Sequence, residues 1–364
     1  MTQKVILIYP YFTGISGAYN RYLLLKRLLE KRKISVKFIL FKEKKYNFKL
    51  SRIIFKSIRF LKVEFLIFYY SIIKKYSLIT DYNPSLIALI SKKVYIQIHD
   101  IRWENRKYAR HAAFFYKILL FFLRNYSNII TVSKTSLEAI NKISGRKKNI
   151  KYLYNSVSQD YIKASNKIGK SKVFNKKNLL YESINFDLPN IIYIATLSPR
   201  KNHIYLLEAL SSLKNALNVN LIGYPLDKNI ESLIKNKSKL NLKNKTKINY
   251  FPKLSQKELS LLLLFSSAYV STSMNEGFGI PILEANLYKL PLIISDIDIH
   301  KELFPKARFF KTKKQLINLL NGTKPLSKDT INKRKKILQE IDEDNLEKSF
   351  NYSNLSKDLI KILF

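Results

Sequence analysis

The sequence predicts an α/β protein made of two doubly wound parallel sheets. An apolar strand at residues 5–9 is followed by a loop, a helix at 18–33 with apolar residues at helical spacing, and a second strand at 35–41. Strands and helices alternate in the same way in the second half of the chain. With 364 residues, of which 46% are apolar, the chain is long enough for two domains with sizeable cores.

A polar stretch at residues 158–189 separates the two halves of this α/β pattern. It is rich in Lys and Asn and has little periodicity, so it predicts a linker. The sequence therefore predicts an N-terminal domain at residues 1–157 and a C-terminal domain at residues 190–344.

The composition excludes several kinds of site. The chain contains no cysteine, which rules out disulfides, thiolate zinc sites and cysteine nucleophiles. The first residues indicate a buried strand and not a signal peptide. The best candidate for a membrane-spanning helix, residues 53–73, is interrupted by Lys56, Arg59, Lys62 and Glu64. We expect a protein made in the cytosol that is either soluble or peripheral to a membrane.

The charge is strongly basic, with 66 Lys and Arg against 26 Asp and Glu and a net charge of +40. Residues 1–60 contain 15 of the basic residues against two acidic ones, Glu30 and Glu43. Such an excess attracts polyanions, either nucleic acid or an anionic lipid surface. A compositional drift toward Lys, Asn and Ile explains the same numbers, so the charge alone does not identify a partner.

Residues 271–285 pass from the end of a strand through a glycine loop into a helix. Gly277 and Gly279 indicate a tight turn, and Pro281 stands where a first helical residue needs no N–H donor. Backbone N–H groups and the positive end of a helix dipole then point at one spot, which predicts an anion site. The alternative is that the glycines only form a turn.

Two carboxylates flank this loop, Glu276 before it and Glu284 in the first helical turn. A carboxylate repels a phosphate, so each is better suited to binding hydroxyl groups, in which nucleotide sugars are rich. The alternative reading of Glu284 is that it only favours the start of the helix.

A second candidate anion site follows the strand at 191–195. Arg200 and Lys201 stand in the turn before a helix at 203–213. Arg binds phosphate in a bidentate fork, and Lys adds a point charge. In a chain with 66 basic residues, two ordinary surface cations are the alternative.

The N-terminal domain contains two further candidate sites. His99 follows a strand at 95–98, and the carboxyl ends of parallel strands are where α/β sheets place their sites. The alternative is that His99 is a structural histidine at a strand end, hydrogen-bonded to the local backbone. Gly14 and Gly17 lie in the first loop but do not complete a Gly-x-Gly-x-x-Gly motif, so a dinucleotide cofactor is poorly supported.

Residues 106–124 combine basic with aromatic and aliphatic side chains. Two readings of this segment remain open. It is either a basic amphipathic helix suited to a membrane interface, or a core helix with a solvated face.

Residues 276–284, Glu-Gly-Phe-Gly-Ile-Pro-Ile-Leu-Glu, resemble the Glu-x7-Glu signature of retaining glycosyltransferase family 4 and its GT-B relatives. The Pro-Arg-Lys-Asn string at 199–202 and the His99-Asp100 pair are similar to further motifs of that family. The resemblance implies the GT-B fold, in which two doubly wound Rossmann-like domains face a central cleft. It also implies that a C-terminal helix at 345–364 packs back on the N-terminal domain.

The activity that this resemblance implies is transfer of a sugar from a nucleotide diphosphate sugar to a hydroxyl group, with retention of configuration. The donor-binding residues would be Arg200, Lys201, Gly277, Phe278, Gly279, Ile280 and Glu284. Glu276 and His99 would be the catalytic residues, with Glu276 bonding sugar hydroxyls and His99 beside the donor sugar. Gly14 and Gly17 would form the glycine loop on the acceptor side.

We expect no cofactor and no required metal. Cations and N–H groups already in place would stabilise the departing diphosphate. Asp296 and Asp298 have Asp-x-Asp spacing but lie outside the proposed phosphate loops. Many relatives carry another Arg near the position of Thr196, and its absence leaves the composition of the diphosphate clamp open.

The expected partners are a nucleotide sugar, a lipid-linked glycan acceptor and an anionic membrane surface, without nucleic acid. The implied pathway is bacterial surface polysaccharide (O-antigen or capsule) assembly, with a cytoplasmic protein bound peripherally to the inner face of the membrane. One alternative is a GT-B-fold sugar-nucleotide epimerase, which would need acid/base residues for the sugar ring. The other is a non-enzymatic polyanion-binding protein, which the charge alone favours.

Overall fold

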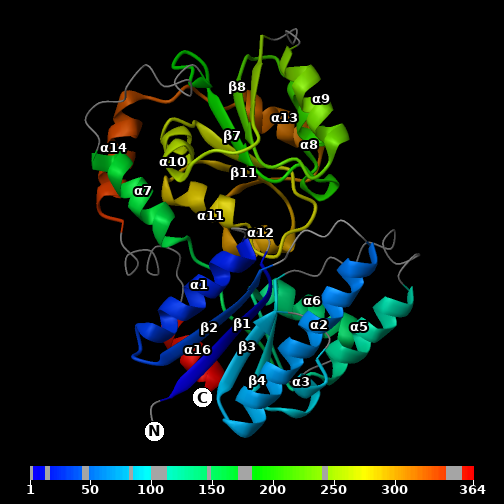
Figure 1. Ribbon diagram of the computed structural model, residues 1–364. Helices are drawn as coiled ribbons and strands as arrows, with labels where there is room; N and C mark the ends of the chain where they lie inside the picture. Colours follow the sequence, from blue (N-terminus) through cyan, green and yellow to red (C-terminus); the bar gives the residue numbers. More distant parts are fainter. Residues whose placement is uncertain are drawn as a thin grey trace. The chain divides into compact units, whose positions relative to one another are not determined.

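The computed structural model describes residues 3–12, 17–42, 49–81, 85–99, 113–145, 149–170, 183–239, 245–341 and 355–364. The chain forms two compact units, Met1–Ser156 with Glu347–Phe364, and Val157–Leu346. Each unit contains a six-stranded parallel sheet with helices packed against it (Figure 1). The predicted α/β class with two doubly wound sheets is confirmed.

The first unit is built on a sheet in the order β2-β1-β3-β4-β5-β6, in which all neighbouring strands are parallel. Its strands are β1 (Lys4–Phe12), β2 (Ser35–Lys42), β3 (Ser77–Asp81), β4 (Val94–Ile98), β5 (Asn128–Thr131) and β6 (Ile150–Tyr152). Its helices are α1 (Gly17–Glu30), α2 (Lys49–Phe68), the π-helical turn η1 (Tyr69–Ile73), α3 (Ile87–Ile90), α5 (Ala113–Asn125), α6 (Lys134–Ser144) and α16 (Leu355–Leu363).

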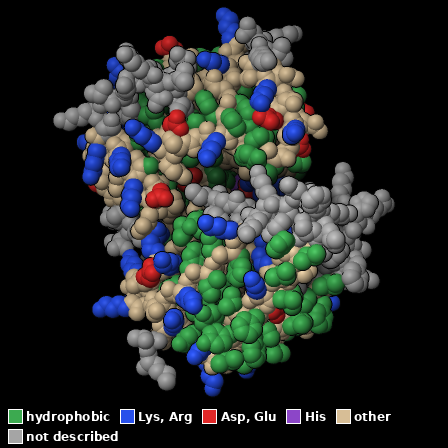
Figure 2. Space-filling view, viewed as in Figure 1, with side chains coloured by type: hydrophobic (Ala, Val, Ile, Leu, Met, Phe, Trp, Pro, Cys, Tyr) green, Lys and Arg blue, Asp and Glu red, His purple; other side chains and the backbone are tan. Residues whose placement is uncertain are grey.

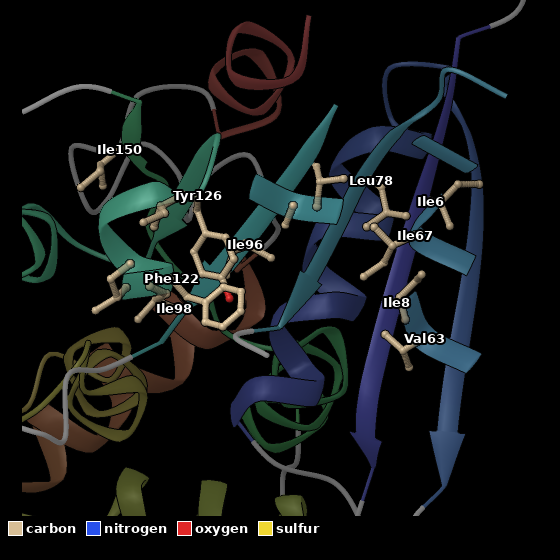
Figure 3. Packing of buried hydrophobic residues seen from close by; sticks show 14 of the residues in the cluster. Ile6, Ile8, Val63, Ile67, Leu78, Ile96, Ile98, Phe122, Tyr126 and Ile150 are labelled. Carbon is tan, nitrogen blue, oxygen red and sulfur yellow. The ribbon is translucent and has the colours of Figure 1, made fainter. Parts of the chain in front are cut away.

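Neighbouring residues of β1 belong to two different cores, because successive side chains of a strand point to opposite faces of the sheet. Ile6 packs with Val63 of α2 and Phe122 of α5 in one buried cluster (Figure 3). Leu7 packs with Leu359 of α16 in the other, together with side chains of α1. The central strands are therefore covered on both faces, as an all-parallel sheet requires.

The end of the chain completes the second of these cores. α16 packs against α1, and Leu355, Leu359 and Leu363 are all buried. Ser77 Oγ at the start of β3 donates a hydrogen bond to the carbonyl of Leu363 over 3.2 Å. Removing α16 would expose the apolar face of α1.

Capping residues set several helix boundaries. Ser133 Oγ accepts a hydrogen bond from the backbone N–H of Ser136 at the start of α6. In the second unit, Ser255 and Thr312 each form a reciprocal capping box with the residue three positions later. These caps set where α6, α10 and α13 begin.

The linker predicted at 158–189 needs correction. Residues 159–170 form helix α7 (Gln159–Lys170), which belongs to the second unit and packs against α14 and α10. Its sequence is polar, but Tyr161 and Ile168 are buried on one side. The Lys and Asn content hid a helix that is amphipathic and buries a narrow apolar stripe.

The segment at 106–124 lies partly outside the described residues, and the structure describes α5 from Ala113 onward. Phe122 and Leu123 are buried in the core of the first unit, whereas Phe121 is 54% exposed. The described part of this segment therefore contributes to the core, and its suggested role at a membrane interface stays a prediction.

The second unit is built on a sheet in the order β12-β11-β10-β7-β8-β9, again with all neighbouring strands parallel. Its strands are β7 (Asn190–Ile194), β8 (Asn218–Ile222), β9 (Lys247–Phe251), β10 (Ala268–Ser271), β11 (Leu292–Ser295) and β12 (Arg308–Phe310). Its helices are α7, the 3-10 turn η4 (Pro199–Lys201), α8 (His203–Ser211), α9 (Lys228–Lys239), α10 (Gln256–Leu264), α11 (Ile280–Leu287), α12 (Asp298–Leu303), α13 (Lys313–Asn321) and α14 (Lys328–Gln339).

The strand order places a switch point between β7 and β10. From β7 the chain moves outward through α8 to β8 and β9, and from β10 it moves the other way through α11 to β11 and β12. Helices α8, α9 and α13 pack together, and α7, α10 and α14 form a separate group (Figure 1). The loops after β7 and β10 leave the sheet side by side at the carboxyl ends of these strands, where open α/β sheets bind ligands.

Gly223, which follows β8, allows the chain there to lie close to the backbone after β7, beside this switch point. A Cβ at this position would lie 1.8 Å from the carbonyl oxygen of Ala195, which follows β7. The obstacle is backbone, so it cannot be relieved by a side-chain rotation.

We predict that Gly223→Ala destabilises the protein by about 3 kcal/mol or more, because the strand ends must separate to admit the methyl group. Gly322→Ala is the control, since its Cβ would make only ordinary contacts and its φ is −80°. The control should change stability by less than about 1 kcal/mol. Equal melting temperatures for the two variants would contradict the close approach.

Candidate active site

The loop after β10 leads into α11 through a left-handed residue. Gly279 caps the helix with a φ of 89°, a conformation that L side chains rarely adopt. Pro281 follows in the first turn of α11, as predicted, where its missing N–H removes no helical hydrogen bond. Strand, glycine loop and helix are thus arranged as an anion site requires.

The turn after β7 is fastened to this loop by hydrogen bonds to its backbone. Met274 N–H donates to the carbonyl of Arg200 over 2.9 Å, and Thr272 Oγ1 donates to the carbonyl of Asn202 over 2.9 Å. From β7, Tyr193 OH donates to the carbonyl of Lys201 over 2.6 Å. These bonds fix the two predicted anion loops against one another within one unit.

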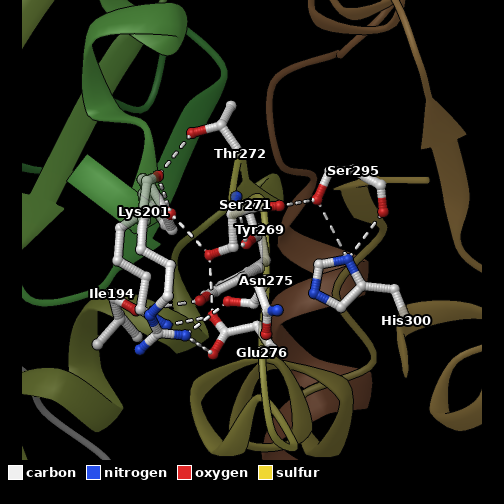
Figure 4. Close-up of polar contacts among 12 residues, drawn as sticks. Ile194, Lys201, Tyr269, Ser271, Thr272, Asn275, Glu276, Ser295 and His300 are labelled. Carbon is white, nitrogen blue, oxygen red and sulfur yellow. Dashed lines mark hydrogen bonds and ion pairs between the residues drawn. The ribbon is translucent and has the colours of Figure 1, made fainter. Parts of the chain in front are cut away.

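A cluster of three charged side chains lies where the two loops meet (Figure 4). Glu276 is ion-paired with Lys201, and its Oε2 lies 3.1 Å from Arg200 Nη1. Ser273 Oγ donates to Glu276 Oε1 over 2.8 Å. Arg200 Nη1 also donates to the carbonyl of Asn275. The Glu276 and Lys201 side chains are only 10% and 12% exposed, against 31% for Arg200.

The Glu276 carboxyl stays ionised in this cluster. Burial by itself raises the pKa of the group, but the charges of Lys201 and Arg200, with the hydrogen bonds from Lys201 and Ser273, outweigh it. The net effect lowers the pKa of Glu276 below its ordinary value. The cluster therefore holds one negative and two positive charges, so it carries a net positive charge.

The second carboxyl of the motif behaves in the opposite way. Glu284 on α11 is 9% exposed, and burial raises its pKa to about 8. At neutral pH the group is mostly protonated, so it can donate one hydrogen bond and accept others. Two carboxyls eight residues apart therefore have different protonation states, which suits one to cations and the other to hydroxyl groups.

A cavity of about 280 Å³ adjoins the loop that carries Glu276. Its lining includes the polar side chains of Asn202, Thr272, Ser273 and Ser295. Hydrogen-bonding groups of this kind suit a hydroxylated ligand.

The spacing of Asp296 and Asp298 does not produce a metal site in the structure. Lys301 Nζ lies 2.5 Å from Asp296 Oδ1, and Lys311 Nζ lies 3.7 Å from Oδ2. Within the described ranges, no three His, Cys, Asp or Glu side chains are grouped so that they could hold a metal ion.

In the first unit, His99 forms a pair with Asp81 at the carboxyl ends of β4 and β3. His99 Nε2 lies 3.0 Å from Asp81 Oδ1, and the two side chains are 26% and 15% exposed. A carboxylate can only accept, so Nε2 carries the proton and Nδ1 is left as the hydrogen-bond acceptor. Asp81 thus fixes the orientation and tautomer of the histidine.

The pair is supported by a buried cation that the sequence reasoning missed. Arg21 on α1 is 2% exposed, and it donates to Gln97 Oε1 over 3.2 Å and to the carbonyls of Leu153 and Tyr154. Gln97 Nε2 in turn donates to Asp81 Oδ1 over 3.5 Å. Burial lowers the pKa of Arg21 to about 9, which still leaves it charged at neutral pH. The sequence does contain a signal for this contact, because Arg21 stands among the apolar positions of α1.

The structure brings together the predicted residues of the second unit and places the others separately. The start of α11 brings together Arg200, Lys201, Glu276 and the buried stretch Gly277–Gly279. Glu284 lies in α11 itself. Ile280 is the first residue of that helix and Phe278 is 4% exposed. His99 and Gly17, which is the first residue of α1, belong to the first unit, and Gly14 lies outside the described residues.

The part of the chain that holds both anion loops can be assigned to a family. Residues 181–341 match the family described as Glycosyl transferases group 1. This stretch contains Arg200, Lys201, Glu276 and Glu284. Residues 181–341 are a glycosyl transferases group 1 domain.

Curated relatives of this chain include two enzymes named as mannosyltransferases. The chain is 34% identical over 121 residues to the serotype-specific mannosyltransferase WbdA of Escherichia coli, which covers 32% of this chain and 14% of WbdA. It is 25% identical over 222 residues to the O-antigen chain mannosyltransferase RfbU of Salmonella typhimurium, which covers 59% of this chain and 55% of RfbU. The chain thus spans a small part of WbdA and about half of RfbU.

The fold resembles that of solved glycosyltransferase structures along its whole length. Anabaena HepE, solved in complex with UDP and glucose, matches with a TM-score of 0.65 at 17% identity, covering 99% of each chain. At this identity the likeness concerns the fold, and it confirms the GT-B class expected from the motifs.

The protonation of Glu284 predicts a stability that depends on pH. Its pKa in the folded protein is about 8 against an ordinary 4.5, so the folded state keeps a proton that the unfolded state releases. Stability therefore falls as pH rises from 4.5 to 8, by up to about 1.4 kcal/mol per pH unit from this group. The side chain in Glu284→Gln cannot ionise, so the variant does not lose this stability as pH rises.

We expect the melting temperature of Glu284→Gln to rise relative to the wild type by several degrees between pH 6 and pH 8. Glu208→Gln is the control, because the Glu208 side chain is 52% exposed. A difference between Glu284→Gln and the wild type that stays constant over this pH range would show that Glu284 is ionised in the folded protein.

The His99–Asp81 geometry can be tested without knowing a substrate. The chain has four histidines, so their ring ¹⁵N signals can be assigned individually. In the neutral ring we expect His99 to have its proton on Nε2, and Asp81→Asn to relax this preference because an amide both donates and accepts. His300, whose Nδ1–H donates to the carbonyl of Ser295 over 2.8 Å, should keep its signature and serves as the internal control. An unchanged His99 tautomer in Asp81→Asn would contradict the pairing.

Proposed function

We propose that this protein is a glycosyltransferase that moves a hexose from a nucleoside diphosphate sugar to a hydroxyl group of a glycan acceptor. The cluster of Arg200, Lys201 and Glu276 at the start of α11 carries the proposal, because it combines a net positive charge with a helix N-terminus. The names of WbdA and RfbU support a mannosyl donor as the first to test.

In this reaction the bond between the anomeric carbon and the diphosphate breaks, and a bond to the acceptor oxygen forms. The departing diphosphate takes the electron pair of the broken bond and develops negative charge, and the proton of the acceptor hydroxyl passes to it. We assign the stabilisation of this negative charge to Lys201, Arg200 and the N–H groups around Gly279. Their preorganisation is supported by the hydrogen bonds that tie the two loops together.

Glu276 and Glu284 have separate roles in this proposal. The diphosphate competes with the Glu276 carboxylate for Lys201 and Arg200, so that donor binding frees the carboxylate to accept hydrogen bonds from sugar hydroxyls. Glu284, protonated and buried, binds ribose hydroxyls as both donor and acceptor. We assign His99, with Nδ1 as its hydrogen-bond acceptor, to the transferred sugar, and the expected retention of configuration is part of the same proposal.

The acceptor and the location of the protein are inferred more indirectly. The likeness to the O-antigen chain mannosyltransferase RfbU supports a glycan acceptor, and we propose that it is linked to a lipid at the inner face of the cytoplasmic membrane. None of the described helices combines the length and the apolar character needed to span a bilayer. We propose that attachment is peripheral, through the basic and apolar surface of the first unit.

We predict that Lys201→Ala and Arg200→Ala each lower sugar transfer by about 100-fold or more, with a smaller effect on the binding of a free nucleoside. The control is Lys257→Ala, an exposed cation at the start of α10. The assay follows transfer to an acceptor and donor turnover without one. Full activity in either clamp variant would contradict its role, and acceptor-independent conversion of the donor to another sugar nucleotide would indicate an epimerase.

A chelator provides a further test of the clamp. If cations of the protein alone meet the diphosphate charge, transfer should continue at an unchanged rate in excess EDTA. Loss of activity that magnesium restores would contradict the metal-free mechanism.

A further inference from the structure

A row of exposed apolar side chains runs along α2 and η1 of the first unit. Its members recur at alternating spacings of four and three residues, which places them on one side of the helix. We call the row the apolar stripe; it consists of Ile54, Ile58, Leu61, Phe65, Phe68 and Ile72. Each is at least 39% exposed, and Leu61 and Phe65 are both 65% exposed.

The opposite side of the same helix is already used by the core. Val63 and Ile67 are 1% and 0% exposed in the cluster that covers the sheet. Glu64 Oε2 accepts a hydrogen bond from the backbone N–H of Ile87, which fastens α2 to α3. The helix therefore has two apolar faces, and the apolar stripe is the one that the fold of this unit does not need.

The stripe continues onto neighbouring elements. Ile73 at the end of η1 is 54% exposed, and at the adjacent α3 the N-cap residue Leu86 and Ile90 are 63% and 73% exposed. Figure 2 shows apolar side chains gathered over this part of the first unit with Lys and Arg side chains beside them. A contiguous apolar surface with a polar rim marks an interaction site, whereas scattered exposed residues do not.

The charges around the stripe have one sign. Lys56 and Lys62 on α2 and Lys74 and Lys75 after η1 are exposed. Glu64 is the one acidic residue in the sequences of α2 and η1, and it is used by α3. Exposed apolar side chains together with lysines, without exposed carboxylates between them, fit the boundary between the headgroups and acyl chains of an anionic bilayer.

We propose that the apolar stripe is a docking surface that enters the interface of an anionic lipid bilayer, with the surrounding lysines at the level of the headgroups. This specifies the surface for the peripheral attachment in the proposed function and places it on α2, η1 and α3. The spacing would also suit a coiled coil with a second copy of this chain. In such a pair the lysines of the two copies would face each other without acidic partners, which disfavours it.

The test is co-sedimentation of the full-length protein with vesicles of phosphatidylethanolamine and phosphatidylglycerol, at 0.1 and 0.5 M salt. We expect the wild type to bind, and to retain part of its binding at high salt because the apolar contact is not screened. The double variant Leu61→Glu with Phe65→Glu should bind at least tenfold less. Because both positions are exposed, circular dichroism should show an unchanged fold.

The matched control is Tyr224→Glu with Leu226→Glu in the second unit, where the two side chains are 65% and 66% exposed. It should sediment like the wild type. The proposal is overturned if the stripe variant binds vesicles like the wild type, or if the control loses binding to the same degree. It is also overturned if light scattering shows a wild-type dimer that the stripe variant dissociates, with no vesicle binding by either.

The transfer reaction is tested separately. Thermal stabilisation by a nucleoside diphosphate should be the same in the stripe variant and the wild type, since the clamp lies in the second unit. Loss of vesicle binding with intact nucleotide stabilisation supports the docking surface. If the wild type binds nucleotide but not vesicles, the docking surface fails while the proposed transferase stands.

Discussion

The ion pairing of Glu276 with Lys201 and Arg200 is the interaction on which the site of the second unit depends. It joins a residue of the loop after β10 to residues of the turn after β7, which are separated by 75 positions in the chain. Without Glu276, two cations would be held close together at the end of the sheet with only hydrogen bonds to oppose their repulsion. With Glu276 present, Lys201 and Arg200 are held in position, and a diphosphate can replace the carboxylate as their anionic partner.

The same cluster accounts for the difference between the two carboxyls of the motif. Glu276 and Glu284 are both largely buried, so desolvation acts on both in the same direction. Among the residues that the structure describes, cations lie beside Glu276 and lower its pKa, whereas burial alone acts on Glu284 and raises its pKa to about 8. A single helix start thus presents an ionised and a protonated carboxyl, which is the combination needed to bind both a charged diphosphate and neutral hydroxyl groups.

Much of the fold could be predicted from the sequence, because its signals are local. Apolar strands, the cap at Ser133 and the Gly279–Pro281 helix start each depend on a few neighbouring residues. The helix at 159–170 was missed because its buried side forms a narrow stripe in a polar sequence. The exposed side of α2 could not be recognised either, since apolar residues on both sides of a helix ordinarily indicate burial.

The residues of the candidate site could be named from motifs, but their partners could not. Sequence reasoning assigned Glu276 to sugar hydroxyls, whereas the structure pairs it with the cations of another loop. It named His99 but not Asp81 or Arg21, because these contacts join residues 18 and 76 positions apart, through β3 and β4. Long-range contacts of this kind depend on strand order and register, which no local pattern contains.

The most direct measurement of the central claim is thermal stabilisation of the wild type and Lys201→Ala by a panel of nucleoside diphosphate sugars. The account predicts that at least one compound raises the melting temperature of the wild type, with about 2.7 kcal/mol gained when its concentration is 100 times the dissociation constant. Lys201→Ala should lose most of this gain. A panel that leaves the wild type unaffected, or that stabilises Lys201→Ala equally, would contradict a diphosphate site built on this cluster.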